Sequence, residues 1–198
     1  MDELVIRPLT PALLGDYCYF FENVAHTDNP AWDRCYCVDY CGADNAGMDY
    51  DNESPQLRRE LAVRFVKAGL IQGYLAYLDS RVAGWLNVND RSACLRSSGW
   101  EQIMGRSPTA ADERKIKSVF CFTVAPALRG RGIAEALLRR AVADAQAAGY
   151  ACMEAYPNKG EADMFYSYVG PPALYKKLGF QPWGETENRL ILRKDLTK

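Results

Sequence analysis

The chain has 198 residues, of which 48% are hydrophobic and 25% charged, the ordinary balance of a globular domain large enough to bury its own core. A formal net charge of −1 argues against nucleic acid as the main partner, because binding phosphates requires a basic face. The sequence holds no apolar run of roughly 18 residues and no signal-peptide pattern at its N-terminus, so we expect a cytoplasmic protein without a membrane partner.

The N-terminal half predicts one strand and two helices. Leu4–Pro8 is an apolar run typical of a strand. Thr10 before Pro11, and later Ser54 before Pro55, each pair a capping side chain with the residue that best tolerates the first helical position. Each pair therefore predicts the start of a helix.

Between these two helices, residues 25–52 form a long irregular segment that carries several aromatic side chains. A loop of this length in a compact domain is usually functional or disordered, and its aromatic residues favour an ordered lid. The aromatic residues are Trp32, Tyr36, Tyr40 and Tyr50.

A hairpin follows the second helix, over residues 71–89, with a turn at Asp79-Ser80-Arg81. Residues 91–117 are polar, and they predict at most a helical turn at Trp100–Met104. Near the C-terminus, Phe180–Pro182 and Arg189–Arg193 predict a final strand pair.

The most informative stretch is a predicted strand–helix–strand unit. Ser118–Val124 and Tyr150–Tyr156 are strongly apolar, and Ile133–Ala148 between them repeats apolar residues at helical spacing. A strand–helix–strand connection places the two strands parallel with a right-handed crossover.

The loop that precedes this helix reads Arg129-Gly130-Arg131-Gly132. Glycines at a helix N-terminus let backbone N–H groups face outward, where the helix dipole favours an anion such as a diphosphate. A Walker loop does not fit, because no Lys-Ser/Thr pair follows, and a dinucleotide motif would require a third glycine at Glu135. An ordinary glycine-containing loop is the alternative that the spacing leaves open.

Seven cysteines, an odd number, indicate a reducing compartment with buried free thiols. Cys35, Cys37 and Cys41 lie close together in the sequence, and zinc would need a fourth ligand, either His26 or Cys18. The Cys-x-Cys spacing is unusual for zinc, and a short strand with both thiols on one face explains it as well. We therefore predict no metal, and His26, the only histidine, is expected to be a solvated loop residue.

Two motifs resemble those of the GNAT N-acetyltransferases. The run from Val124 to Ala134, which contains Arg129-Gly130-Arg131-Gly132, is similar to the family's acetyl-CoA loop, Arg/Gln-x-x-Gly-x-Gly/Ala. Ala173-Leu-Tyr-Lys-Lys-Leu-Gly-Phe180 is similar to the family's second signature, a short helix that carries a tyrosine and ends in Gly-Phe. The two motifs are independent of each other, and they occur along the chain in the same order as in the family.

The resemblance implies an α/β (α+β) fold: a mixed, mostly antiparallel sheet with one parallel strand pair and helices on both faces. Residues 1–198 would form a single domain, with a cofactor-binding core at about 115–180 and acceptor-side segments at about 25–52 and 157–170. The implied reaction moves an acetyl group directly from acetyl-CoA to an amine of a small molecule or peptide. The resemblance leaves the oligomeric state open, and a homodimer is one of the alternatives.

The resemblance also implies the roles of individual residues. The diphosphate would lie on the amides of Arg129, Gly130, Arg131, Gly132, Ile133 and Ala134, and the pantetheine arm along Phe122, Thr123 and Val124. The Val124 amide would hold the acetyl oxygen. Tyr175 matches the residue that protonates the leaving thiolate; from ordinary phenol and thiol pKa values, full transfer is uphill by about 2 kcal/mol, so Tyr175 would act mainly as a hydrogen-bond donor.

The acceptor amine must also lose a proton. Glu154 is our first candidate for the base, with Asp39 and Glu101 as alternatives. Many family members carry an asparagine where this chain has Tyr168, which suggests an aromatic acceptor site walled by Tyr166 and Tyr168.

Such a site, facing Trp32–Tyr50 with Asp33, Asp39 or Glu161 at its rim, suits a cationic molecule. Two other functions stay open: an acetyl-CoA sensor without turnover, and a thiol or metal protein that uses the Cys35–Cys41 cluster.

Overall fold

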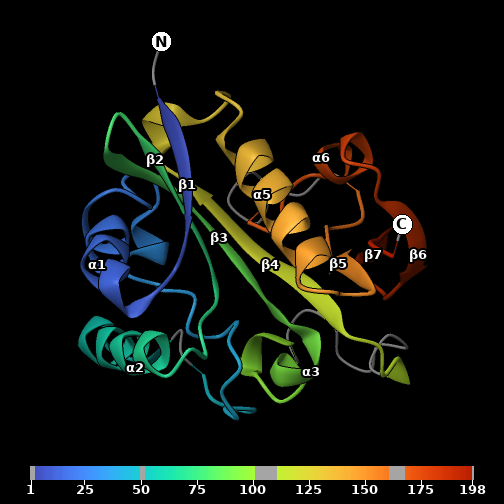
Figure 1. The fold of residues 1–198 in the computed structure, drawn as a ribbon. Coiled ribbons are helices and arrows are strands. Elements are labelled where there is room, and N and C mark those ends of the chain that lie inside the picture. Colours follow the sequence, from blue (N-terminus) through green and yellow to red (C-terminus); the bar gives the residue numbers. More distant parts are fainter. Residues whose placement is uncertain (1–2, 50–51, 101–110, 161–167, 198) are drawn as a thin grey trace.

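A mixed sheet of seven strands forms the centre of the protein (Figure 1). The computed structural model describes residues 3–49, 52–100, 111–160 and 168–197. Along the sheet the order is β1-β2-β3-β4-β5-β7-β6, and β4 and β5 form the one parallel pair among the described strands. The predicted mixed, mostly antiparallel sheet is thereby confirmed. The strands are β1 (Leu4–Pro8), β2 (Gly73–Leu78), β3 (Arg81–Asp90), β4 (Ile116–Val124), β5 (Cys152–Ala155), β6 (Gln181–Glu185) and β7 (Leu190–Asp195).

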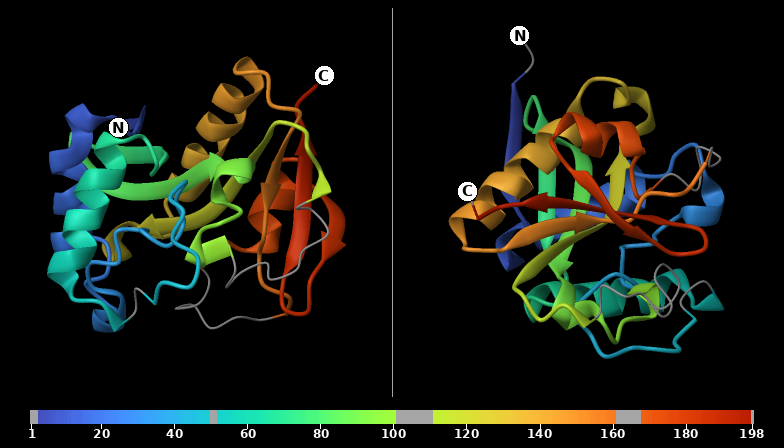
Figure 2. Two further views of the ribbon diagram at one scale, coloured as in Figure 1. Left: turned by 90° about the horizontal axis from the view of Figure 1, so that it is seen from below. Right: turned by 90° about the vertical axis from the view of Figure 1, so that its right-hand side faces the viewer.

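Helices cover both faces of this sheet, as predicted (Figure 2). α5 and α6 lie on one face and α1 and α2 on the other, so the buried side chains fall into two separate hydrophobic clusters. No helix within the described ranges is both long and apolar enough to cross a membrane. The helices are η1 (Pro11–Leu13), α1 (Leu14–Asn23), η2 (Pro30–Trp32), α2 (Pro55–Lys67), α3 (Arg91–Cys94), η5 (Pro126–Leu128), α5 (Ile133–Ala147) and α6 (Pro172–Lys177).

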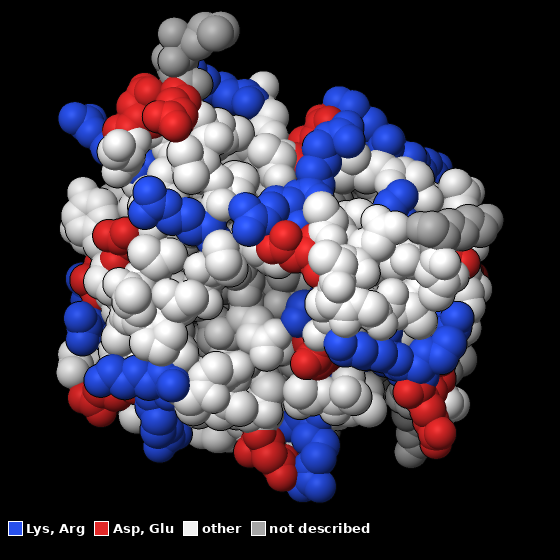
Figure 3. All heavy atoms as spheres, in the orientation of Figure 1, with Lys and Arg blue, Asp and Glu red and all other residues white. Residues whose placement is uncertain are grey.

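Charged side chains of both signs are interspersed over the face drawn in Figure 3. This distribution agrees with the net charge of −1 and shows no extended basic surface on that face.

The predicted helix starts are partly confirmed. The Ser54 hydroxyl accepts a hydrogen bond from the Leu57 amide at 3.2 Å and caps α2. Thr10 was expected to cap a helix in the same way, but its side chain makes no capping bond. Its backbone carbonyl accepts from the Leu13 amide instead, which closes a short 3₁₀ turn before α1.

The hairpin and the closing strand pair form as predicted. Asp79 and Ser80 both have positive φ (48° and 64°), the conformation of a two-residue turn that matches the twist of the flanking strands. Arg81, which was assigned to the turn, begins β3 instead. Of the helical turn predicted at Trp100–Met104, all but Trp100 lies outside the described residues.

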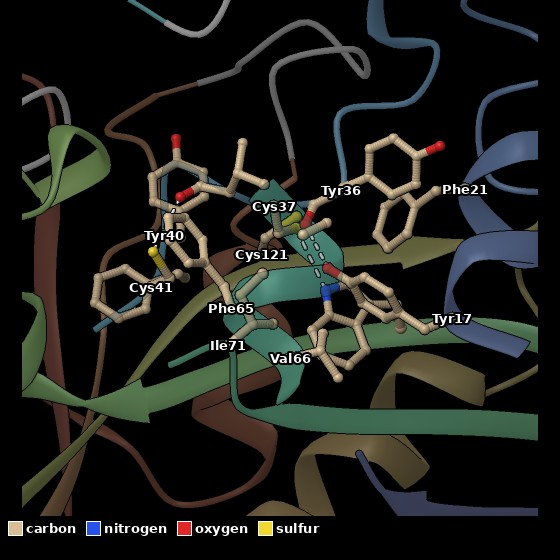
Figure 4. Close-up of a cluster of buried hydrophobic side chains, with 14 of the residues drawn as sticks. Tyr17, Phe21, Tyr36, Cys37, Tyr40, Cys41, Phe65, Val66, Ile71 and Cys121 are labelled. Carbon is tan, nitrogen blue, oxygen red and sulfur yellow. Dashed lines mark hydrogen bonds between the residues drawn. The ribbon is translucent and has the colours of Figure 1, made fainter. Parts of the chain in front are cut away.

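Residues 36–41 of the segment after α1, which the sequence predicted to form a lid, are part of the core. Tyr36, Cys37, Tyr40 and Cys41 are all at least nine-tenths buried, and they pack in the cluster between the sheet and α1–α2 (Figure 4). The Tyr17 hydroxyl donates to the Tyr36 carbonyl and holds the segment down. Tyr50 lies outside the described residues.

The parallel strand pair separates part of the way along β4. β5 pairs with β4 only over Ile116–Val119 and then leaves it. The Ala125 amide bonds to the Ala83 carbonyl, so by alternation the backbone groups of Phe122 and Val124 face away from β3. The edge of β4 therefore faces a gap that β5 does not fill.

Gly73, at the start of β2, tests how tightly the sheet packs. A Cβ on Gly73 would stand 2.0 Å from the Leu86 carbonyl oxygen and 2.5 Å from the Trp85 ring. We expect Gly73→Ala to lower the free energy of unfolding by about 1–3 kcal/mol, as overpacking does. Gly15→Ala is the control, since a Cβ there meets nothing within 4 Å inside α1 and should be neutral or stabilising. Equal urea midpoints for the two variants would contradict the prediction.

Candidate active site

The turn between β4 and α5 forms an open cradle of backbone N–H groups. Gly130 and Gly132 have φ of +77° and +79°, and a Cβ on either would meet nothing within 4 Å. Gly132 is the N-cap of α5 and supplies no side-chain cap, so the first-turn amides of the helix lack an intrahelical partner. Together with the helix dipole, these amides suit a diphosphate, and the cradle therefore fits the predicted cofactor.

A pocket lies beside this cradle, between four segments of the chain. β4, the loop after η5 and the start of α5 line it with five of the residues predicted to bind the cofactor. The five are Phe122, Thr123, Val124, Arg129 and Ala134. Gly130, Arg131, Gly132 and Ile133 are not in the pocket lining, and Ile133, the first residue of α5, is buried in the hydrophobic core.

The segment after residue 167 reaches into the gap beside β4. The Phe122 amide donates a hydrogen bond to the carbonyl of Tyr168. Tyr168, Gly170, Pro171 and Leu174 then line the same pocket. One of the backbone groups predicted to pair with the pantetheine arm is thus engaged by the chain itself in this structure.

Tyr175 lies directly behind this wall. The side chain is fully buried in α6, its hydroxyl donates to the Val169 carbonyl, and its ring packs on Phe180 with a centroid distance of 5.3 Å. Burial raises its pKa well above the usual range, so the phenol keeps its proton. A Cβ on Gly170, which lines the pocket, would stand 3.3 Å from the Tyr175 hydroxyl. The hydroxyl therefore lies directly behind Gly170.

Glu154 is buried in a cluster of charges away from the pocket. Its carboxylate pairs with the Arg193 guanidinium, lies 3.8 Å from Arg91, and accepts from the Tyr156 hydroxyl at 2.7 Å. Met153 and Ala155 face α5, so Glu154 between them faces the opposite side of the sheet. The structure does not bring Glu154 to the pocket lining, and its role as the base stays a prediction.

The two acceptor-side segments meet over the pocket, in their described parts. The rings of Trp32 and Tyr168 are 5.4 Å apart, and the Tyr40 hydroxyl donates to that of Tyr168 at 2.9 Å. Asp33 and Asp39 do not line the pocket. The other residues assigned to this site, Tyr166, Glu161 and the alternative base Glu101, lie outside the described residues.

Two residues of the turn after α1 were missed by sequence reasoning. His26, expected to be solvated, is half-buried in the pocket wall with its ring 5.9 Å from that of Trp32. The Asp28 carboxylate forms an ion pair with the side chain of Arg129, which lines the pocket. No local pattern marks Asp28, because its partner Arg129 lies 101 positions away in the chain. His26 contacts near neighbours in the sequence, but it lines the pocket only because β4 and the segment after residue 167 lie beside it.

Comparison with known proteins places this cradle and pocket in a family. Residues 72–182, more than half of the chain, match the acetyltransferase (GNAT) domain model. The chain belongs to the GNAT acetyltransferase family. It is therefore an acyltransferase that uses acetyl-CoA as co-substrate. No curated protein sequence matches the chain.

Solved structures of GNAT acetyltransferases share the fold of this acetyltransferase. An N-acetyltransferase from Staphylococcus aureus Mu50 is 14% identical, with a TM-score of 0.56 and coverage of 98% of this chain and 99% of the other. YncA from Salmonella typhimurium, a putative acetyltransferase solved with acetyl-CoA, is 16% identical, with a TM-score of 0.51 and coverage of 98% and 95%. The PaiA N-acetyltransferase of Thermoplasma acidophilum, solved with coenzyme A, is 14% identical, with a TM-score of 0.54 and coverage of 98% and 99%.

The cysteines of the acetyltransferase are all free thiols. The strand expected at Cys35–Cys37 does not form, because Tyr36 and Cys37 have left-handed φ of 50° and 49°. Trp85 donates to the Cys37 sulfur at 3.3 Å, inside the core. In the part of the chain that the structure describes, no group of three His, Cys, Asp or Glu side chains is placed to hold a metal.

The glycine cradle can be tested against a matched glycine on the same helix. Gly149 follows the C-terminus of α5 with φ of +71°, and a Cβ there also meets nothing within 4 Å. Ala at either position should cost about 1–2 kcal/mol of backbone strain. Only Gly132→Ala should also raise the Kd for acetyl-CoA, at least about tenfold, which calorimetric titration would measure. An equal rise in Gly149→Ala would contradict the assignment of the cradle.

Proposed function

We propose that this acetyltransferase transfers the acetyl group of acetyl-CoA directly to a primary amine of a small molecule or a peptide. The observation that carries the proposal is the pocket that joins the Arg129–Ala134 cradle to the edge of β4 and continues to an aromatic wall. A cofactor tail, a thioester and an acceptor could therefore lie along one continuous path. The aromatic wall of Trp32 and Tyr168 suits the apolar or cationic part of an acceptor.

The residues of the cradle and of β4 would hold the co-substrate. Amides of Arg129–Ala134 would bind the diphosphate, and the backbone of Phe122 and Val124 would pair with the pantetheine arm. For Phe122 to pair with the arm, its amide must give up the hydrogen bond to the Tyr168 carbonyl and donate to the cofactor instead. Bound acetyl-CoA supplies an activated thioester carbonyl, and the Val124 amide would stabilise the charge that develops on its oxygen.

Proton transfers complete the proposed reaction. Tyr175, which burial keeps protonated, would donate to the departing sulfur. An acceptor amine with an ordinary pKa near 10.4 is mostly an ammonium ion at pH 7, a cost of about 4.6 kcal/mol for the neutral form. A base must therefore act on the acceptor side of the pocket.

A thiol-release assay tests the proposal. Purified protein with acetyl-CoA and a panel of small amines and peptide N-termini should release coenzyme A with at least one acceptor class, and mass spectrometry should show the product 42 Da heavier, roughly one acetyl group. Binding of acetyl-CoA without thiol release across the panel would instead identify a sensing module. Stoichiometric metal in the purified protein would instead support a metal protein that uses the Cys35–Cys41 cluster.

A further inference from the structure

We propose that His26 is the base that takes the proton from the acceptor ammonium, with Cys35 as its positioning partner. The inference rests on the proposed function and names the group which that reaction requires. It replaces Glu154, which the sequence favoured, with a residue that lies at the pocket.

The pocket lining contains few side chains that can accept a proton. Among its described residues, the titratable groups are His26, Arg129 and Tyr168. A guanidinium stays protonated and has no acceptor. The Tyr168 hydroxyl is engaged by Tyr40 at 2.9 Å and lies 3.5 Å from the Arg189 guanidinium. His26 is left as the proton acceptor, and histidine is the side chain that ordinarily changes charge near neutral pH.

The His26 ring is held in a defined position. Its centroid is 6.2 Å from that of Phe21 in α1 and 5.9 Å from that of Trp32 in η2. Nε2 is 3.4 Å from the Cys35 sulfur. If Nε2 donates its proton to that sulfur, Nδ1 carries the lone pair and is the nitrogen that can accept a proton.

The charges around the ring support that tautomer. Hydrogen bonds from Cys37 and then from His26 hold the pKa of Cys35 well below its usual range, against the effect of burial. A sulfur with thiolate character stabilises the imidazolium that forms when His26 takes up a proton. Among the residues that the structure describes, the other charged groups on this side of the pocket are Asp28, on the same turn, and Arg129, with which Asp28 is paired.

The proton balance of the step is complete. The acceptor arrives as an ammonium ion, and one of its protons moves to Nδ1 of His26. The freed nitrogen lone pair forms the new C–N bond as the C–S bond breaks and its electron pair stays on sulfur. Tyr175 gives its proton to the sulfur and is reprotonated by the second proton that leaves the new amide nitrogen. Each turnover therefore releases one proton, the one that passes from His26 to solvent.

His26→Gln tests the assignment, with Thr27→Ala as the matched control on the same turn, since Thr27 is exposed and outside the pocket. We expect kcat with a responsive amine to fall 10²–10⁴-fold in His26→Gln, while the Kd for acetyl-CoA and the melting temperature stay close to wild type. The loss should shrink as the pH is raised towards the pKa of the amine. Thr27→Ala should keep wild-type kcat.

Two readouts separate a base from a structural residue. As the only histidine, His26 gives a single imidazole signal in an NMR pH titration, and its midpoint in the acceptor complex should coincide with the acidic limb of kcat. Cys35→Ala should move that limb to lower pH, because the sulfur that stabilises the imidazolium is removed.

If the wild type is active and His26→Gln keeps kcat within threefold of it, the base assignment is overturned while the proposed function stands. An acidic limb of the kcat profile that is unchanged in Cys35→Ala would overturn the role given to Cys35. A wild-type protein that transfers acetyl to no amine would overturn the proposed function and this inference together.

Discussion

Replacing Tyr175 with phenylalanine is expected to lower kcat about 100-fold, with little change in the Kd for acetyl-CoA. The substitution removes the hydroxyl that would donate to the departing sulfur and leaves the ring packed against Phe122 and Phe180. Loss of the bond to the Val169 carbonyl should cost stability by only about 1 kcal/mol. Steady-state kinetics and calorimetric titration measure the two effects separately.

Tyr74→Phe is the matched control for this variant. Tyr74 belongs to the same hydrophobic cluster, and its hydroxyl donates to Asp144 at 3.0 Å, away from the pocket. It should lose similar stability and keep kcat.

The pKa of Tyr175, which burial raises, gives a second check. Because the phenol stays protonated throughout pH 6–10, it should produce no basic limb in the kcat profile of the wild type over that range. A basic limb that disappears in Tyr175→Phe would contradict this account of the donor.

Removing the buried carboxylate of Glu154 should destabilise the fold by about 3–5 kcal/mol. Glu154 is fully buried, and Glu154→Ala would remove the carboxylate that Arg193 and the nearby Arg91 share, leaving Asp112 as the remaining counter-charge of Arg193. Urea denaturation measures the change. Glu135→Ala is the control, because its carboxylate also pairs with two cations, Arg139 and Lys177, but at the surface, where such pairs contribute little.

A double variant identifies the cause of this loss. Glu154→Met combined with Arg193→Met removes both charges of the pair and should lose less stability than the sum of the two single variants. Additive losses would show that the ion pair is not what stabilises this part of the sheet.

Activity of a milder variant tests the catalytic role that the sequence assigned to Glu154. Glu154→Gln keeps the shape of the side chain and one acceptor oxygen, while an N–H donor replaces the other oxygen. If the carboxylate is structural, kcat at temperatures below unfolding should stay within a few-fold of wild type. A loss of 10² or more with the fold intact would restore Glu154 as the base and count against His26.

The sequence alone predicted the elements whose signals are local. Apolar periodicity located α5 to within one residue of its end, and the cap-proline pair located α2. The glycines at 130 and 132 were interpretable because their backbone conformation depends on near neighbours. The two family motifs lie on these local elements, so the cofactor and the fold class could be predicted before any tertiary contact was known.

Tertiary contacts alone decided which side chains face the pocket. Glu154 is on the strand beside the cofactor groove, but alternation along β5 turns it to the far side of the sheet, towards Arg193. His26 has no sequence motif, and it reaches the pocket because α1 packs on β3 and directs the following turn towards β4. Local periodicity determines which backbone elements form. The identity of the partner across a pocket depends on packing between segments about 100 residues apart, and the chain carries no local signal for that packing.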